Sequence, residues 1–380
     1  MSDQFFTDRA VELDRIRRTL EEPGAKLLVY GPRRMGKTSA LVRAVERHQS
    51  RGGVAFLADM STASTLVDIA NRILEAAGQA LGRRWKDAIG DFVARVGLTI
   101  TLTPDAHGHI IPSLHVRLRS APLEEQRTSL AQTLDAIDGL AAARKTTIGV
   151  VLDEFQEIQR FGGDAAEWHL RGIIQHHQQV SYVLAGSQAH IIERMLDKGR
   201  AFYGLADHLE FGPIDPAHLA TWIDDRMSRA GVRASGVGAE IVAVAGPRTR
   251  DIVQVARRCF DNGRGEGRLE AGAVAAAFED VVDEQEALFQ SMWNALTGLQ
   301  QNVLRAIAAD WNGLTTSASM RQFGLTTSGA ATNSAGAMIE AGLMVKSPSR
   351  TGYGFENPFF RRWVRRETMA DLGASLPPRE

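Results

Sequence analysis

Eight consecutive residues, 31–38, have the types and spacing of a loop that binds phosphate groups. The letters GPRRMGKT fit G-x-x-x-x-G-K-[ST], in which two glycines let successive backbone N–H groups curl around an anion. Lys37 would neutralise the outer phosphates of a nucleoside triphosphate, and the Thr38 hydroxyl would be a ligand of Mg²⁺. The apolar run before the loop and the helix expected after it make a chance match at a strand-to-helix turn the weaker interpretation. The residues that we expect at the phosphates are Gly31, Pro32, Arg33, Arg34, Met35, Gly36, Lys37, Thr38 and Ser39.

Two acids, Asp153 and Glu154, follow the apolar run 148–152. Parallel α/β sheets bind ligands at the carboxyl ends of their strands, where these two side chains would lie. Asp153 would bind Mg²⁺ directly or through water, and Glu154 would orient and deprotonate the attacking water. An acidic pair after a strand is a weak signal by itself and becomes strong only downstream of a phosphate-binding loop. The loop and the pair together predict Mg²⁺-dependent hydrolysis of a nucleoside triphosphate.

Ser187 follows another apolar run, 181–186, and two interpretations of it are open. Its hydroxyl would touch the γ-phosphate, as a third catalytic group, if this strand lies near the other two. Alternatively, Ser187 would simply cap the next helix, because serine is a preferred residue at helix N-termini.

The elements that would hold these residues alternate between apolar strands and amphipathic helices. We expect strands at 27–30, 54–58, 148–152, 181–186 and 208–211. This alternation predicts an α/β domain over 1–212, with a parallel five-stranded sheet sandwiched between helices. Alternating apolar residues around a Pro-Asp-Ala-His-Gly turn predict an inserted hairpin near 98–118. His107 and His109 at its tip are expected to be solvated rather than to bind a metal.

An amphipathic helix is expected just before the first strand, with Asp8 as its N-cap. This helix either packs as an ordinary element of the core or brings Phe6 and Arg9 beside the nucleotide base. Both interpretations are open from the residues alone.

A later helix, expected over 164–179, carries His169, His176 and His177. Three histidines suggest a metal site, but no cysteine or carboxylate completes a ligand set at the spacing typical of zinc. We therefore expect these histidines to lie on a solvated helix face.

Beyond residue 212 the composition changes to helical segments separated by glycine-containing loops. Residues 213–290 are expected to form an all-α lid, in which Pro247 and Arg248 follow Gly246. Arg248 would either reach back to a phosphate or be a surface charge. Residues 295–367 have the pattern of three helices followed by two short strands, which is typical of a winged helix-turn-helix, and 368–380 would be a frayed tail.

The charged residues of this winged helix bear on whether it binds DNA. Its third helix contains Asn333 and neither Arg nor Lys, whereas recognition helices usually direct basic or amide side chains to base edges. Arg350 and the four arginines of the closing segment PFFRRWVRR would allow contacts with phosphate. We therefore favour contact with a protein partner and keep DNA as the alternative.

The overall composition is that of a globular protein. The 380 residues have a net charge of −1 and a hydrophobic content of 44%, and they are enough for two or three domains. Cys259 is the only cysteine, which excludes an internal disulfide and favours a reducing compartment. The start does not resemble a signal peptide, and no apolar run approaches the about 20 residues that span a bilayer. We therefore expect a cytoplasmic protein that does not contact a membrane.

The motifs together resemble those of the prokaryotic STAND-class ATPases, in the archaeal-ATPase-like branch of the AAA+ superfamily. The matching segments, spread over nearly the whole chain, are FTDRAVEL, GPRRMGKTSAL, VVLDEFQEI, VLAGSQ, AGPR and ENPFFRRWVRR. The resemblance implies ATP as the nucleotide, with Phe6 and Arg9 near the adenine. It also implies that Ser187 is the sensor-1 residue, that Pro247 belongs to the lid's Gly-x-Pro motif, and that the strand order is 5-1-4-3-2.

One departure from that family pattern concerns hydrolysis. Family members commonly carry an arginine after a Tyr-Gly pair before the last strand, but Leu205 follows Tyr203-Gly204 here. That arginine is a candidate finger that acts on a neighbouring subunit, and Arg194 or Arg200 would have to replace it. An arginine finger can raise the rate by about a thousandfold or more, so its absence predicts slow turnover.

Three functional hypotheses follow. We favour an ATP-binding, slowly hydrolysing switch whose nucleotide state repositions the lid and the winged helix to signal to a protein partner. The first alternative is a DNA-binding AAA+ ATPase that resembles replication initiators or transposition regulators. The second alternative is a nucleotide-binding scaffold with negligible hydrolysis. Self-association is left open.

Overall fold

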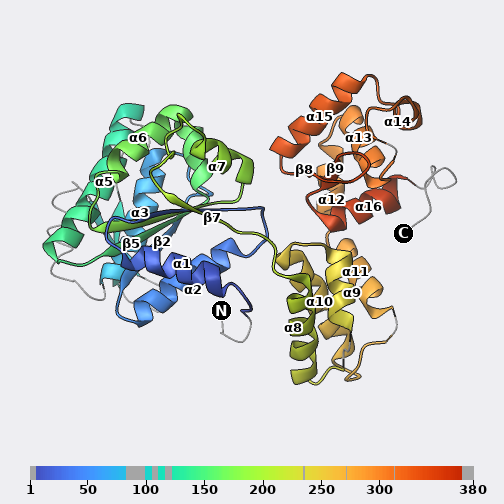
Figure 1. Cartoon of the computed structure of the whole chain (residues 1–380), viewed down its shortest axis with the longest axis horizontal. Coiled ribbons are helices and arrows are strands. Elements are labelled where there is room, and N and C mark those ends of the chain that lie inside the picture. The colour runs from blue at the N-terminus through green and yellow to red at the C-terminus, as the bar shows by residue number, and fades with distance from the viewer. Residues whose placement is uncertain are drawn as a thin grey trace. The chain divides into compact units, whose positions relative to one another are not determined.

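The computed structural model describes residues 6–82, 99–104, 110–115, 122–233, 236–270, 272–311 and 313–369. The chain divides into two compact units, unit 1 (Met1–Ile214) and unit 2 (Asp215–Glu380). The elements of each unit are labelled in Figure 1. The division falls close to residue 212, where we predict the end of the α/β domain.

Unit 1 contains a five-stranded parallel sheet in the order β2-β5-β6-β1-β7. Its strands are β1 (Lys26–Tyr30), β2 (Val54–Asp59), β5 (Ile148–Asp153), β6 (Val180–Gly186) and β7 (Asp207–Glu210). The central strands β5 and β6 are buried along their whole length, which explains their nearly continuous apolar sequences. The predicted sheet is confirmed, and so is the order 5-1-4-3-2 when its strands are counted along the chain.

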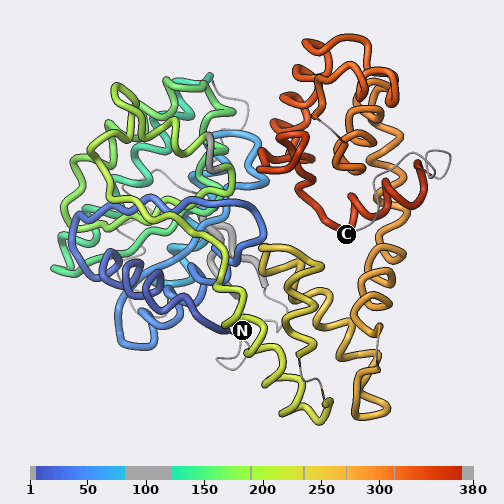
Figure 2. The backbone as a smooth tube through the Cα atoms, turned by 45° about the vertical axis from the view of Figure 1, so that its right-hand side comes forward, coloured from blue at the N-terminus to red at the C-terminus, as the bar shows by residue number. Residues whose placement is uncertain are grey.

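Two strands that are far apart in the sequence, β1 and β7, lie side by side. Leu28 pairs in parallel register with His208, and β6 pairs with the other edge of β1. Figure 2 follows the backbone from the blue β1 to the yellow-green β7, which adds the last strand to the sheet. The loop that follows β1 is therefore flanked by the carboxyl ends of β6 and β7.

Helices cover both faces of this sheet (Figure 1). One face carries α1 (Ala10–Glu21) and α2 (Lys37–Ser50), and the other carries α3 (Leu66–Gly82), α5 (Leu123–Ala143), α6 (Asp164–Ile174) and α7 (Ala189–Leu196). Alternate strand residues enter the two apolar cores, because side chains of a strand point to opposite faces: Leu27 and Val29 enter one core and Leu28 the other. The predicted sandwich of helices around the sheet is thereby confirmed.

The inserted hairpin is also present. Strands β3 (Thr99–Pro104) and β4 (Ile110–His115) pair with each other antiparallel, as predicted for 98–118. His107 and His109 lie outside the described residues.

The N-terminus of α1 differs from the prediction. The N-cap is Arg9 rather than Asp8, and no side chain caps the helix. Both residues have left-handed backbones, with φ of 57° at Asp8 and 69° at Arg9. Arg9 occupies the cap position while its guanidinium bonds to buried carbonyl groups, so Asp8 stands one residue too early to act as the cap.

The histidine-bearing helix is shorter than predicted, and one of its histidines is not solvated. Helix α6 ends at Ile174 rather than 179, and His177 lies beyond its end with 6% exposure. The two ring nitrogens of His177 bond to the Tyr182 hydroxyl at 2.7 Å and to an Asp135 carboxylate oxygen at 2.9 Å. The solvated face that we predict is therefore wrong for His177. Among the residues that the structure describes, no group of three or more His, Cys, Asp or Glu side chains has the arrangement of a metal site.

The described part of unit 2 consists mainly of helices and one antiparallel hairpin. Its elements are α8 (Pro216–Arg229), α9 (Val237–Ala245), α10 (Thr249–Gly263), α11 (Ala273–Glu284), α12 (Glu286–Asn294), α13 (Gly298–Ala308), α14 (Ser317–Phe323), α15 (Ser328–Glu340), β8 (Met344–Lys346), β9 (Tyr353–Phe355) and α16 (Pro358–Thr368). The three helices α13 to α15 and the antiparallel pair β8–β9 follow one another as predicted for the terminal module. The division of this unit into a lid and a winged helix stays a prediction, and residues 370–380 of the expected tail are outside the described part.

Helix α12 is absent from our prediction. It buries Phe289 and Trp293, whose rings pack against Phe360 and Trp363 of α16. These aromatic contacts join the end of the lid segment to the last helix within one compact unit. Among the helices of the described part of the chain, none combines the length and apolarity needed to cross a membrane.

Substitution of Gly238 in α9 tests the close packing of this helix against α8. A Cβ atom at Gly238 would lie 2.1 Å from the backbone carbonyl oxygen of Ala220 in α8, whereas one at Gly336 in α15 would meet nothing within 4 Å. We expect Gly238→Ala to lower the free energy of unfolding by about 1–3 kcal/mol, because a backbone atom cannot yield to the added methyl group. The control Gly336→Ala should raise it by about 0.5–1 kcal/mol. Urea unfolding measures both, and equal stability of the two variants would contradict this packing.

Candidate active site

The loop at 31–38 connects β1 to α2 and has two glycines with different tasks. Gly31 has a φ of 155°, and a Cβ there would lie 2.3 Å from the carbonyl oxygen of Phe211. Gly36 has a φ of 91°, a left-handed conformation, with no atom near its missing Cβ. The first glycine is therefore required by close packing against the end of β7, and the second by backbone conformation.

Lys37 lies at the start of α2 and is 6% exposed. Its ammonium group donates hydrogen bonds to the carbonyl oxygens of Gly31 at 2.8 Å and Pro32 at 2.7 Å. The positive charge is thus held against the loop that would surround the phosphates. In the rest of the loop Met35 is buried, Arg34 and Ser39 are partly buried, and Pro32 and Arg33 are exposed.

The loop and the acid pair meet at one point. Thr38 Oγ1 donates a hydrogen bond of 2.7 Å to Asp153 Oδ2. Asp153 is 3% exposed, and burial raises the pKa of its carboxyl. Hydrogen bonds from Thr38 and from the backbone N–H of Glu154 oppose this rise, and the charges of Glu154 and Asp59 add to it. A hydroxyl and a carboxylate are hard oxygen ligands of the kind that Mg²⁺ prefers, and a cation would offset the cost of the buried negative charge. These residues fit a magnesium site.

Glu154 has a strained backbone and a well-held side chain. It has φ 55° and ψ 42°, a left-handed conformation that costs about 1–2 kcal/mol for a residue other than glycine. Its Oε2 accepts hydrogen bonds from Ser187 Oγ at 2.7 Å and from Gln156 Nε2 at 2.5 Å. The adjacency of β5 and β6 in the sheet brings Glu154 and Ser187 together.

Ser187 is not a helix cap. The N-cap of α7 is Gln188, and no side chain caps this helix. The Ser187 hydroxyl instead bonds to Glu154, and Arg33 Nε approaches it to 3.4 Å. The capping interpretation is therefore wrong, and contact of Ser187 with a phosphate stays a proposal.

Gln156 is a site residue that our sequence reasoning missed. It is 3% exposed, and its Oε1 accepts a hydrogen bond from the backbone N–H of Ser187 at 3.3 Å. A Cβ at Gly186 would lie 2.7 Å from the same oxygen, so the glycine leaves room for this amide. The available signal was an amide residue two positions after the acid pair, between the apolar residues Phe155 and Ile158.

Arg9 joins the loop to the end of β7. It is 4% exposed, its guanidinium lies 4.1 Å from the centre of the Phe211 ring, and it bonds to Glu12 at 2.8 Å. The same group donates hydrogen bonds to the carbonyl oxygens of Met35 at 3.2 Å and Gly212 at 2.7 Å. Arg9 is thus a structural link within unit 1, and Phe6 is half-buried against the same apolar core.

The two residues that we expect in a lid motif, Pro247 and Arg248, differ in burial. Pro247 is exposed, whereas Arg248 is 8% exposed and its Nη2 lies 2.5 Å from an oxygen of Glu356. Glu356 comes directly after β9, so this ion pair links the start of α10 to the terminal hairpin within unit 2. Arg248 is therefore not a surface charge.

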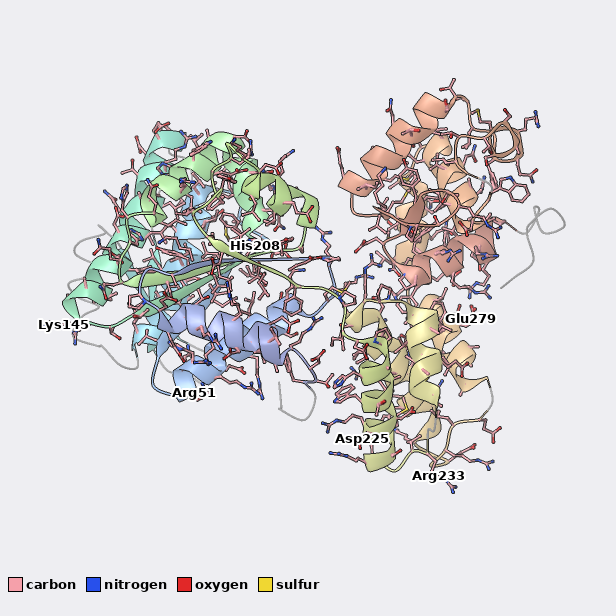
Figure 3. All side chains as sticks on the ribbon, viewed as in Figure 1. Arg51, Lys145, His208, Asp225, Arg233 and Glu279 are labelled. Carbon is pink, nitrogen blue, oxygen red and sulfur yellow. The ribbon has the colours of Figure 1, made fainter. Side chains whose placement is uncertain are left out.

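Three of the other arginines that we considered, as a finger or for phosphate contacts, already have acidic partners. Arg200 forms ion pairs with Asp164 and Glu167 in α6. In unit 2, Arg362 and Arg366 of α16 pair with Glu279 of α11, at 2.5 and 3.3 Å (Glu279 is labelled in Figure 3).

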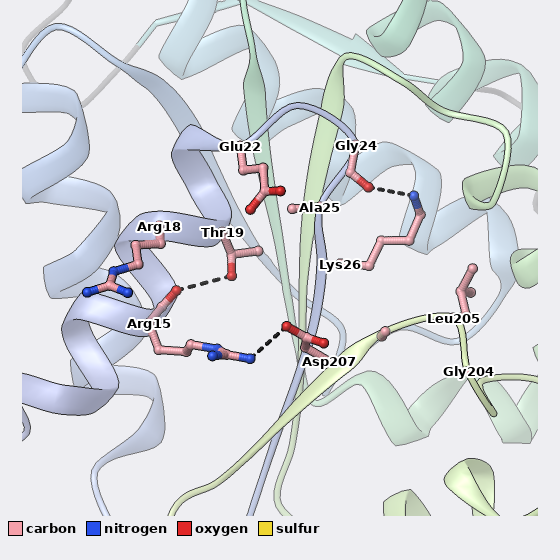
Figure 4. Close-up of a pocket in the computed structure, with 11 residues that line it drawn as sticks. Arg15, Arg18, Thr19, Glu22, Gly24, Ala25, Lys26, Gly204, Leu205 and Asp207 are labelled. Atoms are coloured by element: carbon pink, nitrogen blue, oxygen red, sulfur yellow. Dashed lines mark hydrogen bonds and ion pairs between the residues drawn. The ribbon is translucent and has the colours of Figure 1, made fainter.

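A cavity of about 610 Å³ lies at the opposite end of β1, where β1 and β7 begin (Figure 4). Two of its polar contacts are internal to the lining: Arg15 bonds to Asp207 at 2.6 Å, and Lys26 donates to the Gly24 carbonyl at 2.8 Å. The cavity is remote in the sheet from the loop and the acid pair, and we assign it no role.

Comparisons with known proteins agree with this geometry. Residues 6–215 match the model of a family described as an ATPase domain predominantly from Archaea. A Walker-type ATPase of Pyrococcus abyssi aligns over 96% of this chain and 97% of its own, at 15% identity and a TM-score of 0.64. The Aeropyrum pernix ORC1 protein in complex with DNA aligns over 97% and 95%, at 15% identity and a TM-score of 0.55. The ORC2 protein of the same organism aligns over 97% and 96%, at 16% identity and a TM-score of 0.53. No curated protein matches the chain.

The solved structures share the fold, and the family model goes further because it covers more than half of the 380 residues. The matched range includes the loop, the acid pair and Ser187. This chain is a P-loop ATPase and belongs to the family of ATPase domains found predominantly in Archaea.

Proposed function

We propose that this protein is a STAND-class switch that binds ATP, hydrolyses it slowly, and repositions a helical lid and a winged helix to signal to a protein partner. The observation that carries the proposal is the 2.7 Å hydrogen bond between Thr38 and Asp153, because it brings the phosphate-binding loop and the acid pair to one site. A triphosphate on the loop would then have a general base within reach.

The chain's own groups have complementary tasks in this proposal. Lys37 exchanges the loop carbonyl groups for oxygens of the outer phosphates and stabilises their charge. Ser187 donates its hydroxyl proton to the γ-phosphate as a hydrogen bond, and Glu154 accepts a proton from the attacking water. Mg²⁺, held by Thr38 and Asp153, would neutralise charge that develops on the phosphate oxygens.

We propose that the adenine lies beside Phe6 and Arg9. The guanidinium of Arg9 is occupied by Glu12 and by two backbone carbonyl groups, so Arg9 would shape the base site rather than bind the base through that group. Phe6 would supply an apolar surface for the adenine ring.

Slow hydrolysis is supported by the absence of an arginine at Leu205 and by the pairing of Arg200. A finger must be presented outward to a nucleotide on another subunit. Arg200 is instead engaged with two acids of α6, and Arg194 lies 3.3 Å from the Gln159 side-chain oxygen. Arg200 is therefore not presented as a replacement for the arginine that Leu205 replaces, whereas Arg194 lies exposed at the surface.

The ion pair between Arg248 and Glu356 supports coupling of nucleotide to the terminal module. A carboxylate and a phosphate are both oxygen acceptors for a guanidinium, so the two compete for Arg248. We propose that ATP, with Pro247 beside it, draws Arg248 away from Glu356 and thereby frees the segment that follows β9.

DNA binding is the second candidate function. It is favoured by the structural likeness to ORC1, which is seen in complex with DNA, and by the exposed Arg350 between β8 and β9. Against it, two of the four arginines of α16 are paired with acids of α11. The exposed residues of α15 also include neither Arg nor Lys: they are Ser328, Gly329, Thr332, Asn333, Gly336, Ala337 and Glu340.

The nucleotide site is tested by two substitutions. We expect Lys37→Ala to abolish ATP binding in calorimetry, because the outer phosphates lose their counter-charge. Glu154→Gln should keep ATP affinity but lower the steady-state turnover by about a hundredfold or more, since it removes the general base. Lys26→Ala, a lysine at the other end of β1, is the matched control and should change neither quantity. Retained affinity in Lys37→Ala would contradict the site, and unchanged turnover in Glu154→Gln would favour the scaffold hypothesis.

The coupling is tested at Glu356. Glu356→Gln keeps the shape of the side chain but removes the charge that competes for Arg248, so we expect ATP affinity to rise by about fivefold or more. Arg248→Ala should weaken ATP binding, and adding Glu356→Gln to it should have no further effect. Arg250→Ala, which changes an exposed neighbour, is the control. Identical ATP affinity of Glu356→Gln and the natural chain would refute the competition.

A titration with duplex DNA separates the two candidate functions. For the switch, we expect only weak binding that disappears as salt rises and does not depend on ATP, because α15 exposes neither Arg nor Lys and two arginines of α16 are paired with acids. Affinity that persists at about 0.2 M salt and changes with ATP would establish the DNA-binding alternative.

A further inference from the structure

Gln156 uses both ends of its side-chain amide at the active site. Nε2 donates to Glu154 Oε2 at 2.5 Å, and Oε1 accepts from the backbone N–H of Ser187 at 3.3 Å. The residue is 3% exposed, and its oxygen occupies space that Gly186 leaves open beside it. A buried amide with both ends bonded is held in one orientation, so it also fixes what it touches.

The other donor to Glu154, the Ser187 hydroxyl, can bond to only one acceptor at a time. The Ser187 hydroxyl has a single proton, and at 2.7 Å that proton is directed to Glu154 Oε2. A phosphate oxygen is only an acceptor, so it competes with Glu154 for the same proton. If Ser187 turns to the γ-phosphate, Glu154 loses one of its two donors and keeps the other.

We propose that Gln156 is the positioning residue for the general base. Its amide holds Glu154 Oε2 when Ser187 bonds to the γ-phosphate, and the other carboxylate oxygen then accepts the proton of the attacking water. Gln156 touches neither ATP nor the water and acts only through Glu154. The inference rests on the proposed role of Glu154 as the base.

The backbone explains why residue 156 can do this. The left-handed conformation of Glu154 ends β5 and turns the chain at once into the short 3-10 helix η2 (Phe155–Phe161). The side chain of Gln156 thereby comes back beside the carboxylate of Glu154, two positions earlier. The strain at Glu154 and the hydrogen bond from Gln156 therefore serve the same arrangement.

The test replaces Gln156 by methionine, which has a similar length and no hydrogen-bonding amide. We expect kcat for ATP hydrolysis to fall on the order of tenfold to a hundredfold, as is typical when a reacting group is slightly misplaced. The Kd for ATP from calorimetry should stay within about twofold, because no phosphate contact is lost. Unchanged kcat would overturn the proposal, and so would a loss of ATP affinity that matches the loss of kcat.

Gln159→Met is the matched control. Gln159 lies in the same 3-10 helix, and its amide donates to a different carboxylate, that of Glu167, at 2.5 Å. The same substitution there should leave kcat unchanged. A fall in kcat equal to that of Gln156→Met would mean that the helix, rather than the bond to Glu154, matters, and would overturn the proposal.

A double-mutant cycle separates this inference from the proposed function. In the Glu154→Gln background, Gln156→Met should cause no further loss of the residual single-turnover rate, because its target is gone. A further loss would overturn the positioning role. If Glu154→Gln itself retains turnover, the assignment of the base fails, and that result is read without any Gln156 variant.

A second variant applies if a thermal melt shows that Gln156→Met does not fold. Gln156→Asn keeps the amide but withdraws it by one methylene, so we expect a lower kcat with unchanged ATP affinity. A wild-type kcat in Gln156→Asn would refute the proposal.

Discussion

The meeting of a hydroxyl on α2 with a carboxylate at the end of β5 depends on the order of strands in one sheet. Only β6 separates β1 from β5, and all three run parallel, so their carboxyl ends open on the same edge. Thr38, Ser187 and Asp153 are then delivered by neighbouring strand ends, and a slip of one residue in register would turn the terminal side chains to the other face. The order of the strands in the sheet therefore creates the candidate site, because it determines which side chains can meet.

The parts of this site that could be predicted are those whose signal is local. The glycine-rich loop and the acid pair are each recognisable from a few consecutive residues. The loop follows β1 and the acid pair ends β5, as predicted. The predictions fail at residues whose environment is determined by groups that are distant in the sequence. Asp8 is a good cap by residue type, but Arg9 takes the cap position while bonding to carbonyl groups of the loop and of Gly212. His177 looks like part of a solvated helix face until Tyr182, on the neighbouring strand, accounts for its burial.

The pairing of charged residues in unit 2 could not be predicted from the sequence either. Counting basic residues in the closing helix suggests a surface that attracts phosphate, yet Arg362 and Arg366 are neutralised by acids of α11. Arg248 has its counter-charge in Glu356, which is more than a hundred residues later in the chain. The net charge of this unit gives the balance of its charged residues but not the charges that are available to a ligand. Composition does not reveal which of these charges are paired between distant helices. Helix α12 was not predicted for a related reason, because the aromatic residues that it buries pack against rings of α16, far along the chain.

The guanidinium of Arg9 touches the carbonyl group of Met35 inside the loop and that of Gly212 where the chain leaves the sheet. Gly212 is two residues before the end of unit 1. One rigid, planar group thus links the segment that leaves the sheet to the backbone of the loop, independently of the hydrogen bonds of the sheet. A spectroscopic label at the exit segment would for that reason report on the state of the loop.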